Sequence, residues 1–396
     1  MKIKSIETMI LQYSYEVPIA DAQNFFATRS TVLVIINCDN GLQGIGEAAS
    51  FGGPPQTTKA VIDMELAPHL LGMDASNIEY IWKMLFDRTR QHGRGGIIFS
   101  AISGIDVALW DILGKAASMP VYKLLGGYTD KLLPYASSGF YTNNRDPSAL
   151  AAKVESYFQK GFRYAKIKIA RNPEVFLTPI SHMKNGDQYL YTLEEDLERV
   201  RACCNVAKKY NAKIMVDVNN TWNTYTAIQM GKELEKMGVF WIEEPLALDN
   251  VEGSRELAAA LEMPVAGYES EVGLFRFKDL IDRRAIDIVQ PDVIWSGGIT
   301  ECLKIAAYAY ANSLTVIPHV FSSAVCLAAN AHFLASLSNL GLLEFDQNEY
   351  PLRDELLEEP ITMSQDGFVY LSQKPGLGIS LRKDTVEKYL VARSVI

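Results

Sequence analysis

The chain has 396 residues, of which 48% are hydrophobic and 21% are charged, a composition typical of a globular protein with a large core. The formal net charge of −9 and the lack of any Lys/Arg-rich run argue against nucleic acid or an anionic membrane surface as the main partner. The sequence shows no signal peptide, no apolar run of transmembrane length and no metal spacing among its five cysteines, so we expect a cytoplasmic protein with reduced thiols.

The first elements along the chain differ in type from the later ones. Residues 1–50 have the pattern of strand, loop and strand, with Asp39-Asn40-Gly41 as a hairpin turn. Helical periodicity follows from about 57 to 118, and the apolar stripe of 101–115 favours a structural helix there. Beyond about residue 130, short apolar runs alternate with amphipathic helices, which predicts a parallel sheet with crossover helices.

Seven of these apolar runs end in an ionisable residue. These are Lys168, Asp217, Glu243, Glu269, Asp292, His319 and Glu344, at successive spacings of 49, 26, 26, 23, 27 and 25 residues. All spacings but the first match one unit of a (β/α)8 barrel, which has about 250 residues in eight units. A polar insertion at 171–191 explains the first spacing, and 132–139 supplies an earlier strand. We therefore predict a barrel with these side chains at its C-terminal rim, where barrel enzymes place their chemistry.

Three carboxylates at this rim suggest a metal site. Asp217, Glu243 and Glu269 follow consecutive strands and should converge, and three buried anions need a compensating cation. Oxygen ligands without Cys or His favour Mg²⁺, with Mn²⁺ as a substitute. Asn219 lies two residues after Asp217 on the same face and is a candidate to support the site. The alternative is helix capping, which would favour Ser, Thr and Asn as much as Glu.

Two lysines lie beside this site, in the stretch FRYAKIKIARN. Lys166 and Lys168 share one face of a strand. At roughly 6 to 7 Å and an effective dielectric near 20, two such charges repel by about 2 to 3 kcal/mol. This corresponds to about two pKa units. We therefore expect Lys168 to be partly neutral near pH 7 and to act as a base.

A second base is expected across the ring. Asp292 and His319 follow neighbouring strands and suit a hydrogen-bonded dyad in which the carboxylate fixes the imidazole tautomer. If two bases lie on opposite faces of a small-molecule substrate that the metal holds, we expect the enzyme to abstract the proton α to a carboxylate of that substrate. The metal would stabilise the resulting enediolate, and Glu344 would donate a hydrogen bond to it.

Over nearly its whole length the sequence resembles the mandelate racemase/muconate lactonizing enzyme family of the enolase superfamily. KIK at 166–168 is similar to the family's KxK motif, DVN at 217–219 and IEEP at 242–245 to the next two elements, and LEFD supplies Glu344. Residues 101–115 resemble the family's other signature. The resemblance implies that Lys168 is the base, that the three carboxylates bind Mg²⁺, and that Lys166 contacts the substrate carboxylate.

The resemblance also implies an architecture. The barrel is a modified TIM barrel, (β/α)7β, at 126–365. An α+β capping domain at 1–125 precedes it, and the tail at 366–396 completes that domain. Within the tail, 374–381 resembles the strand that returns to the cap. Relatives are usually homo-oligomers. Loops near Arg29 and near residues 51–55 would close over the substrate. Tyr268 is expected to narrow the pocket, and three histidines are expected to be structural: His69, His182 and His332. The candidate substrate-binding residues are Lys166, Asn219, Glu344, Arg29 and His92.

For function, the resemblance implies a Mg²⁺-dependent acid-sugar dehydratase acting on an aldonate or aldarate. Lys168 or His319 would remove the α proton, and His319 would assist loss of the β-hydroxyl. The alternatives are a racemase, epimerase or cycloisomerase that uses the same intermediate, and a catalytically idle barrel that serves as a scaffold. The intact rim of ionisable residues opposes the last of these.

Overall fold

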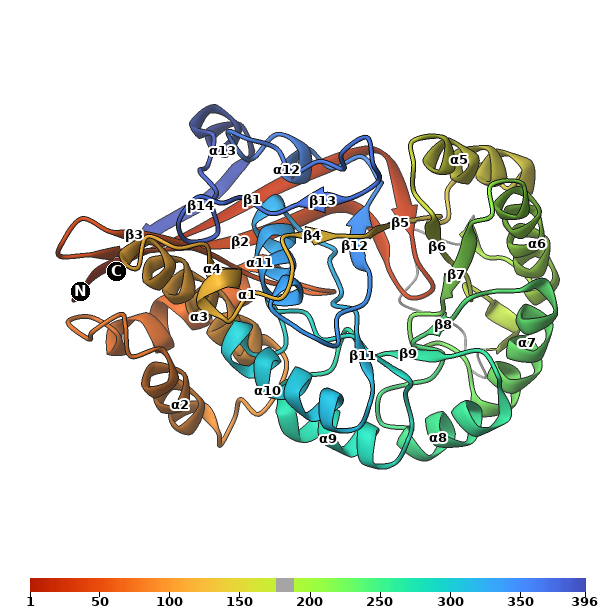
Figure 1. The fold of residues 1–396 in the computed structure, drawn as a ribbon, viewed down its shortest axis with the longest axis horizontal. Helices are drawn as coiled ribbons and strands as arrows, with labels where there is room; N and C mark the ends of the chain where they lie inside the picture. Colours follow the sequence, from red (N-terminus) through yellow and green to blue (C-terminus); the bar gives the residue numbers. More distant parts are fainter. Residues whose placement is uncertain (176–188) are drawn as a thin grey trace.

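The computed structural model describes residues 1–175 and 189–396, and its first sheet unites the two ends of the chain (Figure 1). Four antiparallel strands lie in the order β14-β1-β2-β3. Their bounds are β1 Ile3–Ala20, β2 Phe25–Cys38, β3 Gln43–Ala48 and β14 Leu390–Val395. The expected turn at Asp39–Gly41 joins β2 to β3, with Gly41 at φ 84°. Because β14 pairs with β1, the C-terminus is part of the N-terminal sheet.

Helices follow β3 in the chain. They are α1 Pro55–Ala60, the π-helix Val61–Leu66, the 3-10 helix Ala67–His69, α2 Ile78–Thr89, α3 Ile97–Ala116 and α4 Val121–Leu124. Among them, α1 and α3 pack on this sheet. Helix α3 lies so close to β3 that a Cβ at Gly46 would be 2.1 Å from the Gly104 carbonyl oxygen, so the contact requires glycine. By length and composition α3 is apolar enough to span a membrane, contrary to the expectation from sequence. However, 83% of its apolar stretch is buried within the protein.

Eight parallel strands form the second sheet, in the order β11-β10-β9-β8-β7-β6-β5-β12. Their bounds are β5 Pro134–Ser138, β6 Tyr164–Lys168, β7 Lys213–Asp217, β8 Ile242–Glu243, β9 Val265–Gly267, β10 Ile288–Val289, β11 Thr315–Val316 and β12 Leu343–Asp346. A parallel bridge between Val316 and Leu340 connects β11 to the segment before β12 and closes the ring.

One helix follows each of the first seven barrel strands. These are α5 Pro147–Gln159, α6 Leu193–Lys209, α7 Thr224–Met237, α8 Val251–Ala260, α9 Gly273–Asp282, α10 Gly298–Ala311 and α11 Ala324–Ala335. Helices α5 to α9 line the outside of the barrel (Figure 1). Side-chain caps fix several helix starts; for example, Thr192 and Glu195 form a reciprocal capping box at the start of α6. The predicted (β/α)7β barrel with a separate antiparallel sheet is confirmed.

An apolar layer fills the barrel below the rim. It consists of Tyr135, Met215, Trp241, Ala266, Ile288 and Ile317. Met215, Trp241 and Ile317 each stand two residues before a rim residue, so they share its inward face one layer deeper. The ionisable side chains of the rim therefore rest on a dry apolar floor, where charges interact strongly.

The remaining described elements lie in connections between barrel elements and in the tail. They are β4 Lys131–Leu132, the 3-10 helix Pro173–Val175, α12 Pro351–Asp354, β13 Val369–Tyr370 and α13 Lys383–Tyr389. The expected strand at 374–381 is wrong, because this segment is irregular and docks on α3, where the backbone N–H of Leu377 donates to Asp111. Most of the 171–191 insertion, with His182, lies outside the described residues. The domain boundaries at 125 and 365 remain predictions.

Candidate active site

The strand-end residues meet at the rim. Lys168, Asp217 and Glu243 are the last residues of β6, β7 and β8, and they lie side by side in register. Glu269 lies two residues beyond β9, and Glu344 is within β12. The regular hydrogen bonding of the parallel strands thus places side chains from distant parts of the sequence next to one another, although their chemical roles remain predictions.

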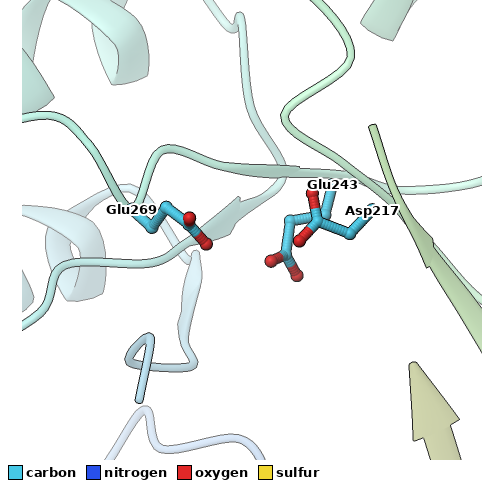
Figure 2. Close-up of side chains that lie close together, drawn as sticks. All are labelled: Asp217, Glu243 and Glu269. Carbon is cyan, nitrogen blue, oxygen red and sulfur yellow. The ribbon is translucent and has the colours of Figure 1, made fainter. Parts of the chain in front are cut away.

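The three predicted metal ligands converge. One carboxylate oxygen from each of Asp217, Glu243 and Glu269 lies within 4.8 Å of the others, and Figure 2 shows Glu269 facing the other two across a common space. Oε2 of Glu269 is buried and makes no hydrogen bond in the described part of the chain, although His319 Nε2 lies 3.3 Å from it. Burial raises the pKa of Glu243 to about 8, although Lys166 opposes this. An all-oxygen donor set with an unsatisfied oxygen and crowded negative charge fits Mg²⁺ or Mn²⁺.

Two groups that the sequence analysis missed orient Glu243. Its Oε2 accepts hydrogen bonds from the side chains of Gln290, at 2.9 Å, and Trp241, at 3.3 Å. Gln290 follows β10 directly, two residues before Asp292, so a rule that accepted any polar residue at a strand end, and not only ionisable ones, would have found it. Such supporting contacts fix the orientation of a carboxylate ligand.

The two lysines are not the isolated like charges that the sequence suggested. Lys166 forms ion pairs with Glu243, with Glu344 at 2.9 Å and with Asp217 at 3.8 Å, and Lys168 pairs with Asp217. Burial lowers the pKa of Lys168, but the carboxylates of Asp217, Glu269 and Glu243 together raise it more, so that its net direction is upward. The expectation of a partly neutral Lys168 is therefore wrong for this state of the site, because carboxylates outweigh the repulsion by Lys166.

The Asp292–His319 dyad is present. His319 Nδ1 lies 2.9 Å from Asp292 Oδ2, and His319 Nε2 lies 3.3 Å from Glu269 Oε2. Asn330 on α11 donates to the second oxygen of Asp292 at 2.9 Å, a contact that no sequence pattern predicts. Burial lowers the pKa of His319, but Glu269 and Asp292 raise it to about 10. The two carboxylates thus favour the protonated imidazole.

Glu344 does not have the expected role of hydrogen-bond donor. Its carboxylate pairs with Lys166 and accepts a hydrogen bond from the backbone N–H of Val320 at 2.8 Å. Burial raises the pKa of Glu344, but Lys166 and His319 lower it to about 2. The group is an anion at neutral pH, and it orients Lys166 and the chain that follows His319.

Asn219 lies beside the carboxylate cluster in a left-handed conformation, with φ 46°. Its backbone N–H donates to Asp217 at 2.9 Å, and its carbonyl oxygen accepts from Gln23 of the cap. The side-chain oxygen has no hydrogen-bond partner among residues 1–175 and 189–396. Asn219 thus positions Asp217 through its backbone N–H, while its side-chain oxygen is an unused hydrogen-bond acceptor.

A cavity of about 410 Å³ lies between the rim and the cap, a size typical of small-molecule sites. Lys168, Glu269 and His319 line it from the barrel, and Arg29 and the 51–55 loop line it from the cap. The position of these cap residues at the cavity agrees with the prediction that the cap loops close over the substrate.

Of the predicted substrate-binding residues, Arg29 lines the cavity, whereas Lys166, Asn219 and Glu344 lie at the rim without lining it. Two other predicted pocket residues, His92 and Tyr268, lie elsewhere. His92 is exposed and its Nε2 lies 2.7 Å from Glu65, so it does not line the cavity. The prediction that Tyr268 narrows the pocket is also wrong, because its hydroxyl contacts Ser254 of α8, at 2.7 Å, in the helix layer. His332 bonds to the backbone of Tyr122 and Leu377, as a structural histidine does.

Glu47 on β3 ties the cap to the loop that carries His319. Its carboxylate is fully buried and accepts hydrogen bonds from the hydroxyls of Ser322 and Ser323 and from the backbone N–H of Cys326 at 2.8 Å. Burial raises the pKa of Glu47, against the effect of these hydrogen bonds. Ser322 lines the cavity, so Glu47 positions one wall of the site.

Replacing Glu47 with Gln is expected to lower the free energy of unfolding by about 1 to 3 kcal/mol, because an amide cannot satisfy all these buried donors. The KM for substrate should also rise, because the loop would shift relative to His319. Urea unfolding and steady-state kinetics check both effects, with Glu16→Gln on the exposed part of β1 as the matched control. Unchanged stability and KM would contradict the positioning role.

A barrel with this rim and a capped cavity defines an enzyme class in which several strand ends contribute to one active site. Residues 5–126 match the mandelate racemase / muconate lactonizing enzyme N-terminal domain, and residues 149–385 match the enolase C-terminal domain-like family. The chain therefore belongs to the mandelate racemase/muconate lactonizing enzyme family of the enolase superfamily.

Named relatives give the reaction classes in this family. The chain is 36% identical to arabinonate dehydratase of Saccharolobus solfataricus over 89% of each chain. It is 31% identical to D-galactarolactone cycloisomerase of Agrobacterium fabrum over 98% of this chain and 99% of that one. The structure of a racemase from Streptomyces coelicolor A3(2) with bound magnesium has a TM-score of 0.86 at 26% identity, covering 98% of this chain and 100% of that chain. The protein is thus an enzyme, either a hydro-lyase or an isomerase.

Proposed function

We propose that this enzyme is a Mg²⁺-dependent sugar-acid dehydratase, which removes the proton α to a carboxylate and then eliminates the β-hydroxyl as water. The observation that carries the proposal is that Lys168 and His319 line one cavity beside the cluster of three carboxylates. The similarity to arabinonate dehydratase over 89% of both chains supports it.

Asp217, Glu243 and Glu269 would hold the metal ion. When bound, Mg²⁺ supplies positive charge to the substrate carboxylate, which makes the α proton more acidic. Lys166, fixed by Glu243 and Glu344, adds a second positive charge at the same end of the site. The chain thus concentrates cationic groups where negative charge develops during the reaction.

Lys168 and His319 divide the proton transfers in this proposal. Lys168 serves as the base, and it must first lose its proton and its ion pair with Asp217. His319 serves as the acid, because Glu269 and Asp292 favour its protonated form. Asp292, held by Asn330, fixes the imidazole so that Nε2 faces the cavity side of the dyad.

Cycloisomerisation is the second candidate. It begins with the same kind of proton transfer, and the relative named D-galactarolactone cycloisomerase matches nearly the whole chain at 31% identity. The two candidates differ in whether water is lost, which product analysis distinguishes.

The test is incubation of the enzyme with Mg²⁺ and a library of sugar acids and their lactones, followed by detection of 2-keto-3-deoxy acids. Appearance of such a keto acid from at least one sugar acid is the expected result. Opening or rearrangement of a lactone without any keto acid would replace dehydration by cycloisomerisation. Lack of turnover across the library would contradict both candidates.

A further inference from the structure

The cap end of the cavity contains an arginine whose charge is already matched. Arg29 on β2 lines the cavity, and its side chain is only 5% exposed. Its Nη1 lies 2.8 Å from Asp346 Oδ2 and 3.2 Å from the Tyr15 hydroxyl. Its Nη2 is buried and has no hydrogen-bond partner among the residues that the structure describes. The charge of Arg29 is therefore matched by Asp346, and its Nη2 is shielded from solvent.

The guanidinium is held in one orientation. Arg29 Cζ lies 3.7 Å from the ring centroid of Phe321 and 3.9 Å from that of Tyr350, so two aromatic rings hold it. Phe321 also lies beside His319, with 6.4 Å between the ring centroids. Stacking combined with an ion pair fixes a planar guanidinium. Arg29 is thus a rigid group separated from the dyad by one aromatic ring.

A second arginine, Arg353, shares Asp346 with Arg29, but it does not line the cavity. Arg353 approaches Asp346 at 3.8 Å, but its other amine pairs with Asp354 at 2.7 Å. Among the described residues that line the cavity, the lysines and arginines are Arg29 and Lys168 alone. Asp21 contributes a carboxylate, and the other polar groups near the cap are neutral. They include Gln12, Asn24, Thr28, Ser30, Ser50 and Ser322.

We propose that this end of the cavity recognises the hydroxyl groups of a monocarboxylic sugar acid, an aldonate, and rejects the corresponding dicarboxylic aldarate. A hydroxyl can donate to and accept from the neutral amide and hydroxyl groups that line this end of the cavity. A second carboxylate would share Arg29 with Asp346 and place two buried anions on one cation. The inference rests on the proposed function, because it specifies the substrate class of that site.

The test compares kcat/KM for aldonate and aldarate pairs of equal length and configuration, such as galactonate with galactarate and gluconate with glucarate, in the presence of Mg²⁺. For the best pair, we expect the aldonate to be favoured by at least about 100-fold, because like charges brought together at a buried site are strongly disfavoured. An aldarate turned over equally well or better would overturn the inference and leave the dehydratase proposal intact. Failure of both classes would overturn the dehydratase proposal and this inference with it.

Two variants test the cause. Asp346→Asn removes the charge that neutralises Arg29, so the aldarate-to-aldonate ratio of kcat/KM is expected to rise by about tenfold or more. Tyr15→Phe removes the other contact to Nη1 without changing charge, and the ratio should stay the same. An unchanged ratio in folded Asp346→Asn would overturn the charge argument. If that variant does not fold, the aldarate-to-aldonate ratio of kcat/KM for the wild-type enzyme decides whether the inference holds.

Discussion

Replacing His319 with Asn is expected to lower kcat for dehydration by about 10²- to 10⁴-fold, the usual contribution of a general acid or base. The amide cannot deliver a proton to the departing hydroxyl. Asn retains a polar group near Asp292 and Glu269, which limits the effect on folding. Lys168→Ala should cause a loss of similar size because it removes the proposed base. Steady-state kinetics with the best aldonate measure both effects.

The matched control is His69→Asn. His69 is exposed and does not line the cavity, so its replacement should leave kcat and KM unchanged. Circular dichroism should show that all three variants are folded. Full activity in both His319→Asn and Lys168→Ala would show that the reaction takes place elsewhere.

The second large effect is stabilisation by the metal. At a Mg²⁺ concentration about 100 times its Kd, the free energy of unfolding should rise by about 2.7 kcal/mol, because the ion binds only the folded chain. The three carboxylates, which offer oxygens within 4.8 Å of one another, are the proposed binding site. Thermal unfolding with and without Mg²⁺ measures the shift without any need for substrate.

Asp217→Asn should abolish this stabilisation, because it removes one of three charged ligands. Asp87→Asn is the control, since Asp87 lies on the surface and pairs with Lys83. Stabilisation by Mg²⁺ that persists undiminished in Asp217→Asn would place the metal outside the cluster.

The barrel could be predicted from the sequence because its signal is local and repeats. Seven apolar runs end at an ionisable residue, and all spacings between them but the first equal one strand and one helix. The strand-end rule therefore located the carboxylates of Asp217, Glu243 and Glu269 without knowledge of any contact. The irregular tail at 374–381 could not be placed in this way, because its partners are on α3, far away in the sequence.

The electrostatics of the site were harder to predict. The sequence shows Lys166 beside Lys168, but the groups that determine their charge are Glu243, 77 residues from Lys166, and Asp217, 49 residues from Lys168. Glu344 was likewise expected to donate a hydrogen bond until the structure placed it against Lys166. Charge states depend on the sum over all neighbours, and only the fold specifies those neighbours.

The same limit applies to the cap. Arg29 is a candidate in the sequence because of its loop, but its partner Asp346 is 317 residues away. His92 has equally suitable chemistry, yet the fold pairs it with Glu65 at the surface. A sequence pattern can identify side chains able to bind a substrate, whereas long-range packing decides which of them face it.

The most direct test of the proposed chemistry is ¹H NMR of the Mg²⁺-loaded enzyme with its best aldonate in D₂O. Removal of the α proton followed by loss of water gives an enol, which takes up a deuteron from solvent at C3. We predict a 2-keto-3-deoxy acid that carries deuterium at C3. Deuterium at C2 of the starting acid or its epimer, with no keto acid formed, would contradict dehydration as the function of this enzyme.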